Sequence, residues 1–265
     1  MEEQLCNKKI LALDSSGLVA SVAVVEGNSR SSSLLAEYTV NYKKTHSQTL
    51  LPMLDEIVKM IELDLETVDA IAVAAGPGSF TGLRIGSATA KGLGLALGKP
   101  LVAVPTVDAL AYNLYGTERI ICPLMDARRN QVYTGIYEFR NDKLETIEPQ
   151  MAVSIQEIAE KLCDLKRDVV FLGDGVPVYG QRLAGELMNR LTAAGKHFSF
   201  APAHLNKQRA GAVGTLALCY LEEGRAETAA EHQPEYLRLS QAERERAEQE
   251  QAARMKQTEN GDAVI

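Results

Sequence analysis

Short apolar runs rich in β-branched residues alternate with polar turns through the first hundred residues. Two longer segments between these runs, 49–62 and 83–97, carry apolar residues at helical spacing. The polar turn Asp14-Ser15-Ser16-Gly17 separates the first two runs and predicts a hairpin. The predicted strands are 9–13, 19–25, 34–40, 70–75 and 101–104. Three strands followed by alternating helices and strands predict a mixed sheet covered by helices.

The second half of the chain repeats this arrangement in part. Two strand patterns around a polar turn at 126–130 again predict a hairpin. Ser154, with Glu157 three residues later, predicts a capping box at the start of a helix. The predicted strands are 120–125, 131–139 and 169–172, and the predicted helices are 154–163, 179–194 and 210–223. Residues 241–265 are charged and glutamine-rich without an apolar stripe, which predicts a solvated, frayed helix or disorder.

The two helices of the first half have more apolar surface than one core requires. In 49–62 the apolar arc covers roughly half of the circumference, wider than the stripe of about 100° expected of a helix on one core. In 83–97 small residues recur at every fourth position between Gly82 and Gly98, which permits close approach of another backbone. Two interpretations remain open: a well-buried helix pair within one lobe, or a four-helix interface between two chains.

Composition and charge narrow the range of functions. The 265 residues are 46% apolar and carry a net charge of −7. The chain therefore lacks the excess of basic residues that binding nucleic acid without another subunit would require. Four cysteines are spread without a C-x-x-C pair and no charged-then-apolar leader opens the chain, which favours a reducing cytoplasm. No apolar run reaches the roughly 18 residues of a membrane span. We expect a cytoplasmic protein without membrane association.

Three aspartates follow predicted strands. Asp14, Asp126 and Asp174 each stand beside small or polar turn residues. In folds that hold a nucleotide between two lobes, such carboxylates lie near a metal and turn N–H groups lie near phosphate. Asp14, Ser15, Asp126 and Asp174 are therefore the candidate cofactor-binding residues. The alternative is that each aspartate only shapes its turn, because its side chain bonds to local backbone.

Other motifs of catalysis are missing from the sequence. The glycine-rich loop 76–82 lacks the lysine of G-x-x-x-x-G-K-[ST] and the spacing of G-x-G-x-x-G. We expect it to have a structural role, with Ser79 and Thr81 as capping residues of the next helix. No two histidines have the spacing of a helical metal-ligand pair, and we expect His46 to be a cap or surface residue. G-x-S-x-G does not occur, which argues against a conventional hydrolase.

Several strings together resemble the TsaB family of bacterial tRNA threonylcarbamoyladenosine biosynthesis proteins. They are ILALDSS, THSQTLLPMLDEI, GPGSFTGLRIG, MDARRNQVYTGIY and LGDGV, and the likeness covers residues 9–240. The resemblance implies an α/β fold in two lobes, the duplicated βββαβα actin-like ATPase (ribonuclease H-like) fold. It also implies a non-catalytic scaffold and activating subunit. Its catalytic partner TsaD transfers threonylcarbamoyl to N6 of the adenosine next to the anticodon of tRNA.

The resemblance also implies how the protein assembles. The expected partners are a TsaD-like catalytic subunit, a TsaE-like ATPase subunit, a second copy when the partner is absent, and tRNA through the complex. ATP and metal are expected on the partner subunits, and none is assigned to this chain. We expect an N-terminal lobe over 1–105 and a smaller lobe over 106–205. A helix near 206–224 is expected to pack back on the first lobe, and 241–265 to form a flexible tail.

Two departures from related patterns argue against catalysis by this chain. The sister family TsaD carries His-Met-Glu-Gly-His, whose histidines hold a metal, where this chain has Thr106-Val107-Asp108-Ala109-Leu110. Threonine and leucine stand where imidazoles would be needed, and leucine cannot ligate a metal. Gly17 also replaces the threonine or serine that is usual in the first phosphate turn. Both changes weaken the case for bound metal or nucleotide.

In the family, the two N-terminal helices mediate pairing. We infer a contact face that includes Leu51, Met53, Val58, Gly86, Ala90 and Gly94. A Gly94→Leu change is expected to abolish pairing and to leave the monomer folded. Two other functions remain open. One is an ATP-dependent phosphotransferase or ATPase that uses Asp14 and Asp126 with Mg²⁺, and the other is a homodimeric module with an unrelated partner.

Overall fold

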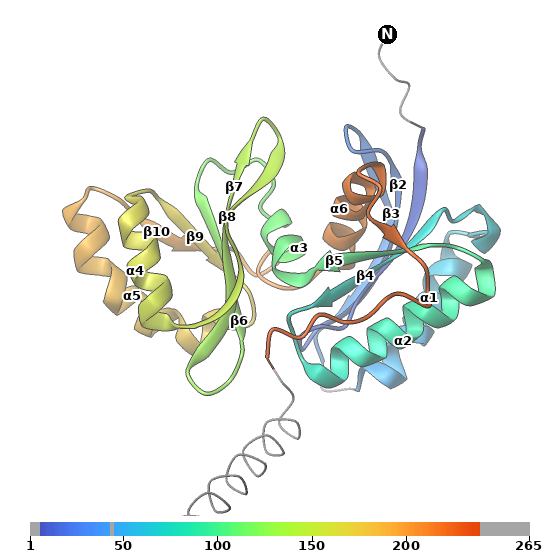
Figure 1. Ribbon diagram of the computed structural model, residues 1–265, viewed down its shortest axis with the longest axis horizontal. Coiled ribbons are helices and arrows are strands. Elements are labelled where there is room, and N and C mark those ends of the chain that lie inside the picture. Colours follow the sequence, from blue (N-terminus) through green and yellow to red (C-terminus); the bar gives the residue numbers. More distant parts are fainter. Residues whose placement is uncertain (1–5, 43–44, 239–265) are drawn as a thin grey trace, which may run out of the picture.

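The computed structural model describes residues 6–42 and 45–238, which form two lobes on separate sheets (Figure 1). The first sheet has the order β11-β5-β4-β1-β2-β3. Its strands are β1 (Lys8–Asp14), β2 (Ala20–Gly27), β3 (Ser32–Val40), β4 (Ala70–Gly76), β5 (Leu101–Pro105) and β11 (Ala226–Glu227). The first three strands form an antiparallel meander, and β4 and β5 run parallel to β1. We call this sheet and its helices the first lobe.

Helices cover both faces of the first sheet. Successive side chains of a strand point to opposite faces. Accordingly, Ile10 and Ala12 pack with α6 (Ala210–Glu222), whereas Leu11 and Leu13 pack with α1 (His46–Met60) and α2 (Phe80–Leu97). A short 3₁₀ turn, η1 (Leu65–Thr67), leads into β4. Both faces of β4 are therefore buried, which agrees with its uninterrupted apolar sequence.

The second lobe has a five-stranded sheet with the order β10-β9-β6-β7-β8. Its strands are β6 (Ile120–Asp126), β7 (Gln131–Arg140), β8 (Lys143–Ser154), β9 (Val169–Leu172) and β10 (Phe198–Phe200). Helices α4 (Ile155–Leu165) and α5 (Val176–Ala193) cover one face. The short helix α3 (Thr106–Tyr112) packs on the other face and also contacts α6 of the first lobe. Helix α3 therefore lies between the two lobes (Figure 1).

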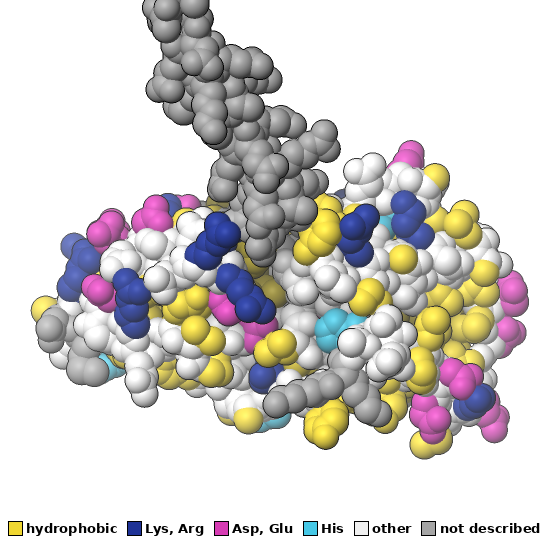
Figure 2. Space-filling view, turned by 90° about the horizontal axis from the view of Figure 1, so that it is seen from below, with side chains coloured by type: hydrophobic (Ala, Val, Ile, Leu, Met, Phe, Trp, Pro, Cys, Tyr) yellow, Lys and Arg dark blue, Asp and Glu magenta, His cyan; other side chains and the backbone are white. Residues whose placement is uncertain are grey.

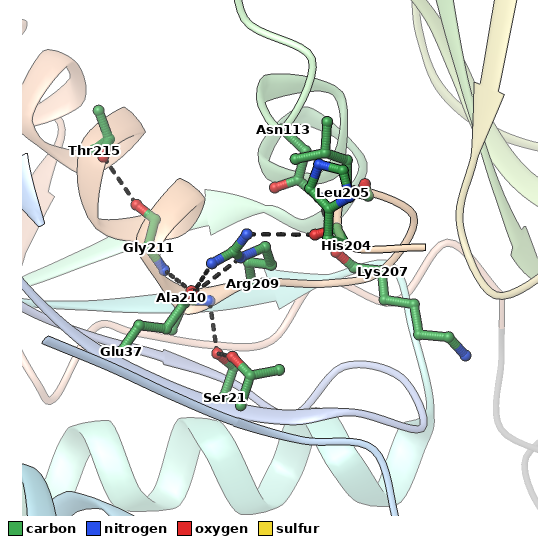
Figure 3. Close-up of polar contacts among 11 residues, drawn as sticks. Ser21, Glu37, Asn113, His204, Leu205, Lys207, Arg209, Ala210, Gly211 and Thr215 are labelled. Atoms are coloured by element: carbon green, nitrogen blue, oxygen red, sulfur yellow. Dashed lines mark hydrogen bonds and ion pairs between the residues drawn. The ribbon is translucent and has the colours of Figure 1, made fainter. Parts of the chain in front are cut away.

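Polar contacts fasten α6 to the first sheet where the chain returns from the second lobe (Figure 3). The N–H of Ala210 donates to Oγ of Ser21 at 2.9 Å, and the N–H of Gly211 donates to Oε1 of Glu37 at 2.9 Å. Arg209 forms an ion pair with the same Glu37 carboxylate. These bonds satisfy N–H groups that the first turn of a helix leaves unpaired, and they fix α6 to β2 and β3.

The structure confirms the predicted fold class, because the order βββαβα occurs in both lobes. The predicted long elements form within a few residues of their expected bounds, and the capping box of Ser154 and Glu157 is present. Helix α1 begins at His46, three residues earlier than predicted. Five elements, η1, α3, β8, β10 and β11, were not predicted. The expected tail over 241–265 lies outside the described residues.

Within the described ranges, no helix combines the length and apolarity needed to cross a membrane.

Candidate functional site

A cavity of about 1070 Å³ lies between the two lobes. The turn after β1 and the N-terminal end of α2 line it from the first lobe. The turn after β6 and Asp174 after β9 line it from the second lobe. Residues 235–238 at the end of the described chain complete the wall. We call this cavity the interlobe cleft.

The structure brings the three predicted aspartates close together, with Asp126 and Asp174 lining the interlobe cleft and Asp14 buried next to Asp174. Oδ1 of Asp174 accepts the N–H of Asp126 at 3.3 Å, and Oδ1 of Asp126 accepts the hydroxyl of Tyr179 at 2.9 Å. Asp14 is 1% exposed, and its Oδ1 accepts the N–H and the hydroxyl of Ser16 at 2.9 and 2.7 Å. Burial raises the pKa of Asp14 to about 6, although the bonds from Ser16 oppose this shift. Burial also raises the pKa of Asp174.

The first turn has little room for a phosphate group. A Cβ atom on Gly17 would lie 2.5 Å from Nε2 of Gln208 and 3.1 Å from Oδ2 of Asp174. Gln208 is 1% exposed, so its amide fills the space beside the turn. A phosphate placed beside Gly17 would meet the carboxylates of Asp14 and Asp174, which is unfavourable in a low dielectric. The residues present therefore do not fit the phosphate chain of a nucleotide.

His46 closes the same turn from the side. Its Nε2 lies 2.8 Å from the carbonyl oxygen of Gly17. Because a carbonyl only accepts, Nε2 carries the proton of this bond. The sequence predicted a cap or surface role, whereas the structure places the imidazole, half-buried, on the wall of the interlobe cleft. Among the described residues, no group of three or more His, Cys, Asp or Glu has the arrangement of a metal site.

The glycine-rich loop packs on the first turn, and the predicted capping role is confirmed for Ser79, whereas Thr81 lies within the first turn of α2. Ser79 is the N-cap of α2, with Oγ accepting the N–H of Gly82 at 3.4 Å. The Ser15 hydroxyl donates to the Gly82 carbonyl at 2.9 Å, so this candidate cofactor residue instead links β1 to α2. A Cβ on Gly82 would approach the Ser15 carbonyl oxygen to 2.1 Å. Glycine is required there for close packing of the backbones.

Helix α3 contains residues 106–110, the segment compared above with the metal motif of the sister family. Thr106 and Leu110 are 0% and 1% exposed and belong to the interior of the protein. Asp108 lies between them in sequence, and its carboxylate accepts the Tyr137 hydroxyl at 2.7 Å and the Tyr220 hydroxyl at 3.0 Å. Tyr137 belongs to β7 and Tyr220 to α6. The carboxylate therefore joins the two lobes.

The structure revises the predicted contact face of α1 and α2. Met53 and Ala90 are 4% and 0% exposed, so both pack inside the first lobe. Gly86 packs against Ser15, and a Cβ on Gly94 would lie 2.4 Å from Cδ1 of buried Leu101. The structure contradicts the expectation that Gly94→Leu leaves the monomer intact, because the new side chain would enter this lobe's own core.

The outward surface of the two helices consists of other residues. Leu51 is 53% exposed, and Val58 is half-buried within the helix pair. Along α2 stand further exposed apolar or small residues. They are Ala88, Gly92, Leu95 and Ala96. We call these four residues and Leu51 the outer helix face. Met60 is also exposed, but it lies on the flank of α1 opposite to Leu51.

Sequence reasoning missed two residues at the first turn of the interlobe cleft. Gln208 lies in a loop without a recognisable motif, and only the tertiary fold brings it to Gly17. His46 stands next to the start of α1, and an isolated histidine gives no sequence signal of its contact with Gly17. The glycine at position 17 was an indirect sequence signal for a contact there, because a residue without a side chain leaves room for the long side chain of Gln208.

Together, two lobes of βββαβα order around a cleft define a protein of the actin-like, ribonuclease H-like class. A family model described as "TsaD: tRNA N6-adenosine threonylcarbamoyltransferase" matches residues 33–246. The chain belongs to this family, among its TsaB proteins. It is 36% identical over 174 residues to the tRNA threonylcarbamoyladenosine biosynthesis protein TsaB of Bacillus subtilis, covering 66% of this chain and 74% of that one.

Other relatives agree. The TsaB protein of Escherichia coli K12 is 32% identical over 176 residues, covering 63% of this chain and 71% of that protein. Among solved structures, YeaZ from Pseudomonas aeruginosa matches with a TM-score of 0.71 at 27% identity. That match covers 87% of this chain and 100% of YeaZ.

Proposed function

We propose that this protein is a non-catalytic scaffold and activating subunit in tRNA threonylcarbamoyladenosine biosynthesis. In this role it pairs in the cytoplasm with a TsaD-like subunit that adds threonylcarbamoyl to N6 of the adenosine next to the anticodon. Membership in the family supports the pathway. The buried Thr106 and Leu110, at the positions of the sister family's metal-binding histidines, are the observation that supports the absence of catalysis.

The outer helix face is our proposed pairing surface. Leu51 and Leu95 are 53% and 71% exposed, respectively. Exposed large apolar side chains gathered on neighbouring helices are typical of protein interfaces. The exposed Gly92 has no atom within 4 Å of an added Cβ, so the backbone of a partner helix can approach it closely. The same surface would serve the TsaD-like subunit and, in its absence, a second copy. A TsaE-like ATPase and tRNA would then join this pair.

A matched pair of glycine substitutions tests this surface. Gly92→Leu adds a bulky side chain on the outer helix face at a position where no atom lies within 4 Å of the new Cβ. We expect the variant to fold normally and to lose affinity for the TsaD-like subunit by a factor of about 100, because a crossing at glycine tolerates no side chain. Gly185→Leu makes the same change at an open position on α5 of the second lobe and should pair normally. Normal pairing of the Gly92→Leu protein in sedimentation would remove the outer helix face from the proposal.

The alternative function is an ATP-dependent phosphotransferase or ATPase, and the three aspartates gathered in the interlobe cleft favour it. Against it stand the buried carboxyl of Asp14 and the Gln208 amide beside Gly17, which leave no place for phosphate. Calorimetric titration of the isolated chain with ATP and Mg²⁺ separates the two functions. We expect no binding, whereas micromolar binding would favour the enzyme.

A further inference from the structure

Two arginines stand at the mouth of the interlobe cleft without an acidic partner. Arg128 and Arg129 lie in the turn between β6 and β7, and both are exposed. Within the residues that the structure describes, neither guanidinium forms an ion pair. The N–H of Arg128 donates to Oδ1 of Asp126 at 2.7 Å, which ties the turn to the end of β6. This bond fixes the position of the two arginines while their charges stay free.

The turn has an unusual backbone. Arg128, Arg129 and Asn130 have φ angles of 63°, 55° and 59°, so three successive residues are left-handed. Such residues are uncommon outside glycine and are found most often where function requires a fixed geometry. Arg238 donates from Nη1 to the Ala127 carbonyl at 2.7 Å and braces the turn from the C-terminal segment. The arginine pair is therefore held by both lobes.

Aromatic rings line the same mouth from the first lobe. Tyr42 and Tyr236 are 70% and 41% exposed. The centroids of the Tyr236 and Phe80 rings lie 4.9 Å apart. The Arg84 guanidinium lies over the Phe80 ring, 5.1 Å from its centroid. On the face seen from below, Lys and Arg side chains occur on both lobes (Figure 2). Exposed rings beside unpaired arginines are the pattern of single-stranded nucleic acid binding.

Charge within the cleft distinguishes a long polyanion from a small one. Asp174 lines the cleft next to the buried carboxyl of Asp14, whereas the arginines of the turn are exposed at its mouth. A triphosphate inserted into the cleft would meet the carboxyl of Asp174. A phosphodiester chain that crosses the mouth would meet the arginines and the rings first, with Glu235 as an exposed acidic side chain in the same lining. We propose that the cleft mouth binds an unpaired RNA segment of the tRNA substrate, with Arg128 and Arg129 on phosphates and Tyr42 against a base.

This inference rests on the proposed function and adds direct contact with RNA to it. The test uses the full chain in complex with its TsaD-like partner and unmodified tRNA. Arg128→Asn with Arg129→Asn removes both charges and keeps a residue that tolerates left-handed backbone. We expect tRNA affinity to fall at least tenfold and the slope of log K against log salt to shrink by about 2. The KM for tRNA should rise while the rate at saturating tRNA is retained.

Three further variants make the result specific. Arg128→Lys with Arg129→Lys keeps both charges and should preserve the salt slope. Arg190→Gln removes an exposed charge from the last turn of α5, away from the mouth, and should bind like the parent. Tyr42→Ala should weaken binding several-fold without changing the salt slope. Unchanged affinity and slope in the double asparagine variant, with the complex intact, would overturn the RNA site alone.

Failure of the proposed function gives a different result. In that case the parent chain would not bind the TsaD-like subunit, and its addition would not change transfer to tRNA. If the asparagine variant instead lost ATP binding while tRNA binding was retained, the mouth would be a nucleotide site and the RNA proposal would be rejected.

Discussion

Asp14 is a carboxyl group held out of water at the end of β1, and its ionisation has a predictable cost. Burial raises its pKa in the folded protein to about 6, above the unfolded value near 3.9. The folded state therefore holds more protons between about pH 4 and pH 6, and this group's contribution to stability falls as pH rises through that range. By pH 7 the cost reaches about 3 kcal/mol.

Asp14→Asn removes this titration, because an amide keeps an oxygen for the bonds from Ser16 and carries no charge. Relative to the parent, the variant should gain stability as pH rises from 4 to 7, by up to about 3 kcal/mol in urea unfolding. Asp142→Asn, in an exposed turn, serves as the control and should parallel the parent. Parallel pH profiles for Asp14→Asn and the parent would contradict the assigned cost.

At the scale of single residues, the sequence predicted part of the interlobe cleft. The aspartates at the strand ends were found because turn chemistry and strand ends are local patterns. Their role was not predictable, because burial of Asp14 and the position of Gln208 depend on packing between segments almost 200 residues apart. The arginines were visible in the turn at 126–130, but their shared position with Tyr236 at the cleft mouth required the tertiary structure.

At the scale of the helix, neighbouring glycines of α2 have opposite environments. Gly92 is open to solvent, whereas Gly94 packs against Leu101. Gly92→Ala should stabilise the protein by up to about 1 kcal/mol, because alanine favours a helix interior. Gly94→Leu should destabilise it by about 1–3 kcal/mol through overpacking. Thermal and urea unfolding of the two variants measure the difference, and equal stabilities would contradict the assigned orientation of α2.

The wide apolar arcs of α1 and α2 predicted either a buried helix pair or an interface between chains, and the pattern alone could not assign the flanks of the helices. A helical wheel does not show on which side of a helix the sheet lies. In the structure, the small residues from Gly82 to Gly94 pack on the turn after β1 and on β5 of the same lobe. The strand β8 was missed because it is a half-exposed strand at the sheet edge with little apolar alternation. Helix α3 was missed because it follows β5 without an intervening turn.

At the scale of the whole molecule, Asp108 links the lobes through two tyrosine hydroxyls. Burial raises the pKa of Asp108, while the bonds from Tyr137 and Tyr220 oppose that shift. Asp108→Ala would leave both buried hydroxyls unpaired and should destabilise the protein by about 2–4 kcal/mol in chemical unfolding. Adding Tyr137→Phe and Tyr220→Phe to that variant should recover part of the loss. A double-mutant cycle without coupling would exclude the link.

The duplicated fold was predictable because both halves repeat the same order of patterns. We propose that the lobe boundaries lie near residues 105 and 205, since the sheets change between β5 and β6 and α6 packs on the first sheet. The angle between the lobes was not predictable, because α3 and the bonds of Asp108 set it.

We propose that this protein assists tRNA modification without catalysing it. The most direct measurement is transfer of labelled threonylcarbamoyl to tRNA by a reconstituted system that contains the TsaD-like subunit and its other partners, with and without this chain. We predict transfer that depends on the folded chain and is lost with Gly92→Leu but retained with Gly185→Leu. Equal transfer in the presence and absence of the folded chain would contradict the claim.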